Sequence, residues 1–211
     1  RKWLEAGVME EGVLSPSEAG TPQGAVASPL LANIYLHYVF DLWAQRWRHR
    51  HARGDMIVVR YADDTVVGFE RLDDAERFLS EMRMRMEQFG LSVHPHKTRL
   101  IEFRRPSSTG GGLGSFDMLG FTHFWGRSRK GNWVVQRKTA SSRFSRALKR
   151  ISEWCRTNRH QPVNEQHEAL SQKVRGHYGY YGITGNMRGL MRYAHEVERT
   201  WRRWLDRRSS K

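Results

Sequence analysis

The chain has 211 residues, of which 38% are hydrophobic, 11% are aromatic and 27% are charged, a composition that predicts a folded protein of one large or two small domains. A mean hydropathy of −0.73, with no apolar run of about 18 residues, excludes a membrane-spanning helix. A single cysteine, Cys155, excludes an intrachain disulfide and is typical of a reducing compartment.

The net charge of +14 is concentrated in the second half of the chain. Residues 1–105 contain 15 basic and 15 acidic residues, so their charges cancel. Residues 106–211 contain 21 basic and seven acidic residues and carry the whole excess. A pI near 10.6 with this distribution favours binding to a nucleic acid or an anionic membrane surface, and the alternative is a basic domain without such a partner.

The first half of the chain alternates helix and strand patterns. Residues 15–24 are rich in turn formers. Ser28 then suits a helix N-cap and Pro29 the first helical position. Apolar residues at intervals of three and four predict a helix over residues 29–50.

Two β-branched runs follow, over residues 56–60 and 65–69. They flank the sequence Tyr-Ala-Asp-Asp, which ends in Asp63 and Asp64. This arrangement predicts a β-hairpin with both acids at its tip.

The next elements are a helix and two short strands. Residues 72–89 have apolar side chains on one side of a helix, which Gly90 stops. Residues 91–93 and 99–103 are then predicted to be strands on either side of a His-Pro-His-Lys sequence that ends in Lys97.

Beyond these elements the composition changes. Residues 106–115 predict a flexible loop between subregions. Residues 116–125 and 133–136 predict strands separated by a basic turn. Helical spacing of apolar residues then predicts one helix that begins near residue 140 and another over residues 186–208. A mixed α and β unit is therefore expected to precede a basic helical unit.

The neighbouring acids Asp63 and Asp64 are the sharpest chemical feature. Adjacent side chains in a strand face opposite sides, but at a tight turn this alternation breaks and two carboxylates can approach one site. Their mutual repulsion is relieved by a hard divalent cation such as Mg²⁺, which prefers oxygen ligands. Aspartate is also a common turn residue, and for this pair taken alone the turn interpretation is favoured.

Five blocks stand in order along the chain and are together far more specific than any one of them. They are GTPQGAVASPLLANIYL (20–36), VRYADDTVV (59–67), FGLSVHPHKTRLIEF (89–103), FDMLGFTHFW (116–125) and VRGHYGYYGITGN (174–186).

With these blocks the chain resembles the reverse transcriptases of group II introns, also called intron maturases, over nearly its whole length. The resemblance implies an α+β fold, a polymerase palm with an antiparallel sheet and helices on one face, followed by an all-α thumb. It implies an RNA-directed DNA polymerase that extends a primer on an RNA template by two-metal nucleotidyl transfer. It also implies binding of intron RNA to aid splicing and mobility.

The resemblance assigns the metal site to the hairpin tip. Asp63 is the expected direct ligand of Mg²⁺, with Mn²⁺ as a substitute ion, and Asp64 is the second, more supporting carboxylate. Lys97 matches a lysine near the leaving pyrophosphate and is expected to act in catalysis, the alternative being a solvated lysine at a strand end.

Further residues match binding regions of the family. Most have a simpler alternative: a turn before a helix for the first pair, an apolar hairpin for the primer grip, and core packing for each tyrosine. The resemblance assigns nucleotide and template binding to Gln23, Gly24 and Tyr61, the primer grip to Leu119, Gly120 and Phe121, and RNA binding to Arg146, Lys149, Arg150, Arg175, Tyr180 and Tyr181.

The resemblance divides the chain into a palm over residues 1–138 and a maturase-specific thumb over residues 139–211. The family's palm has an upstream block with another metal-binding aspartate, and nothing before Ser15 matches it. Asp41 and Asp55 lie in the wrong contexts to replace it. We therefore expect an internal piece of a longer enzyme, without the fingers and with a truncated thumb, that binds RNA but polymerises poorly by itself.

Two other functions remain open. The chain could be an RNA-binding splicing maturase without polymerase activity, although such a protein has no need of two clustered acids. Another palm-type nucleotidyltransferase, such as a nucleotide cyclase, leaves the basic helical half unexplained. The expected partners are an RNA template, a DNA primer, intron RNA and deoxynucleoside triphosphates, with no membrane partner and a cytoplasmic, bacterial-type location.

Overall fold

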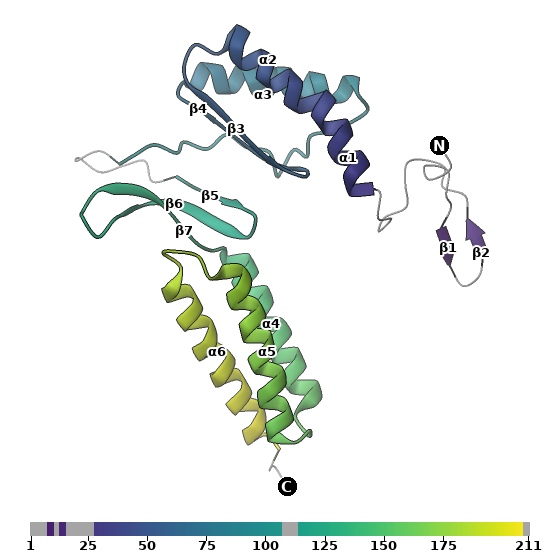
Figure 1. The fold of residues 1–211 in the computed structure, drawn as a ribbon, viewed down its shortest axis with the longest axis vertical. Helices are drawn as coiled ribbons and strands as arrows, with labels where there is room; N and C mark the ends of the chain where they lie inside the picture. The colour runs from purple at the N-terminus through teal and green to yellow at the C-terminus, as the bar shows by residue number, and fades with distance from the viewer. Residues whose placement is uncertain (1–7, 11–12, 16–27, 107–113, 209–211) are drawn as a thin grey trace. The chain divides into compact units, whose positions relative to one another are not determined.

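The chain forms two compact units, Arg1–Leu100 and Ile101–Lys211, and each is described by itself (Figure 1). In the first unit, β1 (Val8–Glu10) and β2 (Val13–Ser15) form a short antiparallel ladder that the sequence did not predict. The computed structural model describes residues 8–10, 13–15, 28–106 and 114–208.

A continuous helical stretch is found where a single helix was predicted over residues 29–50. It consists of α1 (Ser28–Leu36), the π-helix η1 (His37–Asp41) and α2 (Leu42–His51). Arg85 of the next helix donates from Nε to the carbonyl of Val39 within η1, at 3.1 Å. The helix is confirmed, and the π-turn at its centre is a feature that periodicity does not reveal.

The predicted hairpin is confirmed as β3 (Met56–Tyr61) and β4 (Asp64–Phe69), which pair in antiparallel register. One face of the hairpin packs on α2 and on α3 (Leu72–Gln88) (Figure 1). The other face is open, since Ile57 and Val59 are 66% and 49% exposed. The buried core of this unit consists of Val39, Phe40, Ala44, Trp47, Met56, Phe78 and Met86.

The end of α3 follows the prediction, but the two strands after it do not form. Gly90 has a φ of 68°, and the amide of Leu91 donates to the carbonyl of Met86, which closes the helix. Residues 91–93 and 99–103 pair with no strand among the described residues. The prediction was wrong because Leu91 and Val93 pack on the core of the first unit without a strand ladder, whereas Leu100 and Ile101 are exposed.

The second unit begins with a three-stranded antiparallel sheet. Its strands are β5 (Ser115–Met118), β6 (Phe121–Arg127) and β7 (Trp133–Thr139), in the order β5-β6-β7. The predicted run 116–125 is thus two strands joined by a turn at Leu119 and Gly120. The predicted loop over residues 106–115 lies largely outside the described residues.

Three helices follow and lie side by side (Figure 1). They are α4 (Ser141–Asn158), α5 (Val163–Tyr181) and α6 (Met187–Asp206). Their core contains Ile151, Leu170, Tyr193 and Val197, all at most 5% exposed. The sequence predicted α4 and α6 but not α5, whose glycines Gly176 and Gly179 weaken its helical pattern.

A buried amide joins this sheet to the helices. The Asn186 side chain is 1% exposed, accepts from the amide of Thr139 at 3.1 Å and donates to the Thr139 hydroxyl at 2.8 Å. It also donates to the carbonyl of Tyr181, at 2.9 Å. Since β7 and α5 are tied to the start of α6 in this way, the sheet and the three helices form one unit.

The predicted α+β class is confirmed: an antiparallel hairpin with helices on one face in the first unit, and a helical bundle in the second. The compact units divide at Leu100, upstream of the palm–thumb boundary predicted between residues 138 and 139. That functional boundary stays a prediction. Among the described residues, no helix combines the length and the apolar character needed to span a bilayer.

Candidate active site

The tip of the β3–β4 hairpin is a two-residue turn formed by Ala62 and Asp63. Tyr61 and Asp64 close it as the last strand pair, so the turn carries one acid and the first residue of β4 carries the other. Ala62 has a φ of 53°, in the left-handed region. A residue with a Cβ holds this conformation at a cost of about 1 kcal/mol, and such strain concentrates at functional sites.

Both acids at this tip are exposed, and no basic side chain among the described residues pairs with them. Within the described residues, neither Asp63 nor Asp64 makes an ion pair or a side-chain hydrogen bond. Other acids of the unit do, as Asp73 does with Arg71 and Glu81 with Arg77. Two free carboxylates on adjacent residues match the way proteins hold Mg²⁺, through one or two carboxylates with water and substrate phosphates completing the shell.

A third ligand is not supplied by the described part of the chain. No group of three or more His, Cys, Asp or Glu side chains that could hold a metal ion occurs among these residues. Asp41, which the sequence analysis set aside as a ligand, forms a bidentate ion pair with Arg60 at 2.7 and 2.6 Å. The hydrogen bonds from Arg60 lower the pKa of the Asp41 carboxyl below its usual value, which keeps the pair charged.

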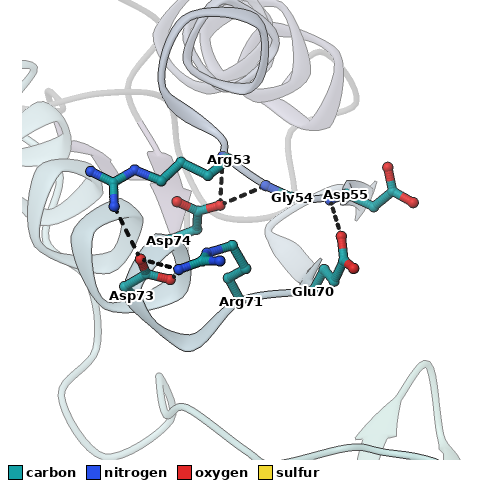
Figure 2. A network of polar contacts seen from close by, with 7 residues as sticks. All are labelled: Arg53, Gly54, Asp55, Glu70, Arg71, Asp73 and Asp74. Carbon is teal, nitrogen blue, oxygen red and sulfur yellow. Dashed lines mark hydrogen bonds and ion pairs between the residues drawn. The ribbon is translucent and has the colours of Figure 1, made fainter.

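The opposite end of the hairpin is held by a second polar network (Figure 2). The Asp74 carboxylate is 4% exposed and accepts hydrogen bonds from the amides of Arg53 and Gly54, at 2.7 and 3.1 Å. Glu70 accepts from the amide of Asp55 at 2.9 Å. These contacts define where β3 begins, and the pairing register then places the acids at the tip.

The other residues predicted to act at this site are only partly described. Gln23 and Gly24 lie outside the described residues. Tyr61 is 65% exposed at the end of β3, next to the acids. Lys97 is exposed in a turn, where its amide donates to the carbonyl of His94 at 3.3 Å. The roles of Tyr61 and Lys97 stay predictions.

Two of the predicted primer-grip residues, Leu119 and Gly120, form the turn between β5 and β6 in the second unit, and the third, Phe121, is the first residue of β6. Leu119 and Gly120 have φ values of 51° and 80°, as in a type I′ turn. The Tyr180 hydroxyl donates to the carbonyl of Leu119 at 2.9 Å, and its ring stacks on Phe121 with centroids 5.8 Å apart. The Phe121 ring also meets Tyr181 edge-on, at 5.3 Å.

Tyr180 and Tyr181, predicted to bind RNA, thus contact the protein's own turn. Tyr180 keeps 56% of its surface exposed, so it both holds the turn and presents a ring face. The remaining predicted RNA contacts are Arg146, Lys149 and Arg150 on α4 and Arg175 on α5, all exposed. Lys149 lies 3.9 Å from Glu153, a distance that leaves its ammonium group hydrated.

Arg60 is the residue near the site that the sequence analysis did not single out. Arg60 directly precedes the Tyr-Ala-Asp-Asp sequence and lies on the same strand face as Met56 and Val58. This position is what the sequence offers as an indication of its role. A charged residue at a position whose period-two neighbours are buried indicates a buried ion pair.

Comparison with known families agrees with this geometry. A family model described as reverse transcriptase (RNA-dependent DNA polymerase) matches residues 1–123, more than half of the chain. The chain belongs to the reverse transcriptase family. A second model, the group II intron maturase-specific domain, matches residues 144–211. Together they identify this reverse transcriptase as one of the group II intron type, which confirms the resemblance.

Two relatives of this reverse transcriptase share short segments with it. The group II intron-encoded protein LtrA of Lactococcus lactis subsp. cremoris is 56% identical over 36 residues, 17% of this chain and 6% of LtrA. An uncharacterized 91 kDa protein in the cob intron of Schizosaccharomyces pombe is 54% identical over 37 residues, 18% of this chain and 5% of that protein. The matched segments therefore span far less than two thirds of either relative.

Proposed function

We propose that the natural protein containing this chain is an RNA-directed DNA polymerase that also binds intron RNA during splicing and mobility. The observation that carries the proposal is the pair of exposed carboxylates of Asp63 and Asp64 on a strained hairpin tip, neither of which pairs with any residue in the described part of the chain. Membership of the reverse transcriptase family supports it, and so does the family match of the basic helical half to a maturase domain.

Within this proposal Asp63 and Asp64 hold Mg²⁺, with Mn²⁺ as the alternative ion. The bound ions supply activation of the primer 3′-hydroxyl and stabilisation of charge on the attacking and leaving oxygens. The chain's own part is positioning: the hairpin presents both carboxylates to solvent, where a primer end and a nucleoside triphosphate can reach them. Lys97 is proposed to lie near the leaving pyrophosphate.

RNA binding is proposed for the exposed basic side chains of α4 and α5. Arg146 and Arg150 make no ion pair with any described residue, so both guanidinium groups are available to phosphates. RNA affinity should then fall steeply as salt rises, because each neutralised phosphate releases counterions.

A splicing maturase without polymerase activity is the second candidate. It is favoured by the lack of a third acid near the tip in the described part of the chain. For the same reason we propose that the 211 residues alone bind RNA but extend a primer poorly. Primer extension by these 211 residues at the rate of the natural protein would contradict this proposal.

The test is Mg²⁺-dependent primer extension on an RNA template by the natural protein. We expect Asp63→Asn to lower kcat by at least about 1,000-fold, because a neutral amide removes the charge that holds the ion. Asp55→Asn is the matched control, since Asp55 is an exposed acid at the opposite end of the same hairpin (Figure 2). Equal primer extension by the wild type and Asp63→Asn would overturn the metal-binding role of Asp63. No extension by the wild type would overturn the polymerase assignment, and intact splicing with no extension would establish the second candidate.

A further inference from the structure

One side chain, that of Arg60, joins the hairpin tip to the helical stretch. Besides its two bonds to Asp41, the guanidinium donates through Nη1 to the carbonyl of Ala62 and to Oδ1 of Asn33, both at 2.8 Å. The Arg60 side chain is 14% exposed. Four hydrogen bonds from a single planar group therefore connect α1, η1 and the turn.

The bond to Ala62 acts on the peptide group that carries Asp63. The Ala62 carbonyl and the Asp63 amide belong to one planar peptide group. A hydrogen bond to the carbonyl oxygen therefore also fixes the orientation of the Asp63 amide. Ala62 has a φ of 53°, which a residue with a Cβ adopts only where its surroundings enforce it. The Arg60 hydrogen bond is an interaction that enforces it.

The partner that holds Arg60 is itself well anchored. Asp41 ends η1 and follows Val39 and Phe40, which are 1% and 2% exposed in the core. Its carboxylate accepts both parallel bonds of the guanidinium, a geometry that a lysine ammonium group cannot reproduce. The rigidity of the core is transmitted through this ion pair to the hairpin tip.

We propose that Arg60 is a positioning residue, which orients the Asp63 carboxylate by holding the peptide between Ala62 and Asp63. The proposal rests on the proposed polymerase function for its catalytic consequence, but its structural part does not. Arg60 bonds backbone and helix and touches neither acid side chain, so its effect on chemistry runs through Asp63 alone.

The decisive variant is Arg60→Lys in the natural protein. Lysine keeps the positive charge and can still pair with Asp41. Its single ammonium group cannot bond Asp41 and the Ala62 carbonyl at the same time, as the guanidinium does. We expect kcat for primer extension to fall about 10- to 100-fold, because a displacement of about 1 Å at a reacting group has this effect. The KM for the nucleotide should change less than about threefold, because substrate contacts are untouched.

Arg77→Lys is the matched control. Arg77 also pairs with a carboxylate of the same unit, Glu81, at 2.7 Å, but the structure gives it no contact with the tip. We expect Arg77→Lys to retain wild-type kcat. Thermal unfolding of both variants, compared with the wild type, shows that each is folded at the assay temperature.

A second readout is independent of catalysis. Selective ¹⁵N labelling of aspartate lets the backbone amide of Asp63 be followed by NMR relaxation. In Arg60→Lys the Asp63 amide should become mobile on the picosecond–nanosecond timescale, whereas the Asp74 amide, at the base of the hairpin, should stay ordered. Arg77→Lys should leave both amides ordered.

The outcomes separate this proposal from the function on which it rests. Loss of kcat together with a mobile Asp63 amide supports it. Wild-type kcat in Arg60→Lys, or a lowered kcat with an ordered Asp63 amide, overturns it while leaving the polymerase assignment intact. Should the wild-type protein incorporate no nucleotide, the proposed function fails, and the Asp63 amide alone decides whether Arg60 positions the turn.

Discussion

Two β-hairpin turns, one in each unit, are held by the same kind of contact but with different chemistry. The β3–β4 turn contains Ala62 at a φ of 53°, and the β5–β6 turn contains Leu119 at a φ of 51°. In each turn a side chain donates to the carbonyl of that residue: Arg60 to Ala62 at 2.8 Å, and Tyr180 to Leu119 at 2.9 Å. A non-glycine residue in the left-handed region is thus held by one directed hydrogen bond in both places.

The difference lies in what holds the donor. Arg60 is 14% exposed and paired with Asp41, so the acidic turn depends on charge and on a bidentate fork. Tyr180 is 56% exposed and held by stacking on Phe121, so the other turn depends on ring packing. The acidic turn is held by Arg60, whose charge Asp41 already neutralises. A cation without such a partner would pair with the carboxylates of the turn.

The largest expected effect comes from removing the Arg60 side chain, which connects Asp41 to the β3–β4 turn. Arg60→Met should destabilise the first unit by about 2 kcal/mol, since the half-buried Asp41 carboxylate loses its bidentate partner and keeps only His37, at 3.4 Å. Hydrogen exchange followed by mass spectrometry on peptides from β3 and β4 measures the loss in the first unit. The double variant Asp41→Asn with Arg60→Met should recover part of it, and a double variant as unstable as the sum of both singles would contradict this account.

The next effect concerns the β5–β6 turn, whose Gly120 lies against the ring of Tyr181. Gly120 has a φ of 80°, and a Cβ there would lie 3.0 Å from the Tyr181 hydroxyl oxygen. Gly120→Ala should destabilise the second unit by about 2 kcal/mol, from backbone strain and this close contact together. Gly131→Ala is the control, because Gly131 has the same φ of 80° with open space around its Cβ and should cost about 1 kcal/mol. Equal losses would show that Tyr181 does not confine the turn.

Acidification should destabilise the second unit at a higher pH than the first. Desolvation lowers the pKa of His177, which stacks between Tyr193 and Tyr181, and also that of His123. A depressed histidine pKa stabilises the folded state fully above the unfolded value of about 6.5, and this stability is lost as pH falls below it. The second unit should therefore weaken from about pH 6.5 downward.

In the first unit the carboxyl groups of Asp41, Asp73 and Glu81 have lowered pKa values. For Asp41, the hydrogen bonds from Arg60 lower the pKa, so its contribution to stability is complete above the unfolded value of about 3.9 and is lost as the pH falls from there through the lower folded value. Urea unfolding monitored by hydrogen exchange at pH 7.5, 6 and 5 measures both units. His177→Phe keeps the ring stack and should flatten the response of the second unit. A first unit that weakens in the same pH range would contradict the assignment.

The smallest effect is expected from the Tyr180 hydroxyl. Tyr180→Phe keeps the stack on Phe121 and removes only the bond to Leu119, so it should destabilise the second unit by about 0.5 kcal/mol. Local exchange of the amides at the β5–β6 turn is the sensitive measurement. A loss as large as that of Gly120→Ala would mean that the hydrogen bond, and not ring packing, holds this turn.

Local patterns predicted the elements whose signals lie within one segment. The β-branched runs around the two acids gave the hairpin, and the apolar stripe with Gly90 gave α3 and its end. These succeeded because strand alternation and a glycine C-cap need no distant partner. Helix α5 was missed since Gly176 and Gly179 interrupt its pattern, and its burial comes from α4 and α6.

The same division applies to the candidate site. The neighbouring acids and their place at a tight turn follow from the sequence alone, because two strands of equal length around four residues leave little choice of register. The positive φ of Ala62 and the π-turn that ends at Asp41 do not follow, nor does the clamp through Arg60. The clamp depends on Asp41 and Asn33, which lie 19 and 27 residues from Arg60 and meet it only when the helices pack on the hairpin.

The sequence by itself therefore determined the family of the chain, the hairpin and the two acids that it presents, since these reside in contiguous residues. Tertiary structure alone decided which charges are neutralised and which remain free. Arg60 pairs with Asp41 and not with Asp63 or Asp64, which are closer to it in sequence. Packing of η1 against β3 brings the Asp41 carboxylate to the Arg60 guanidinium. Charge pairing is set by distance in space, and only the folded core establishes that distance.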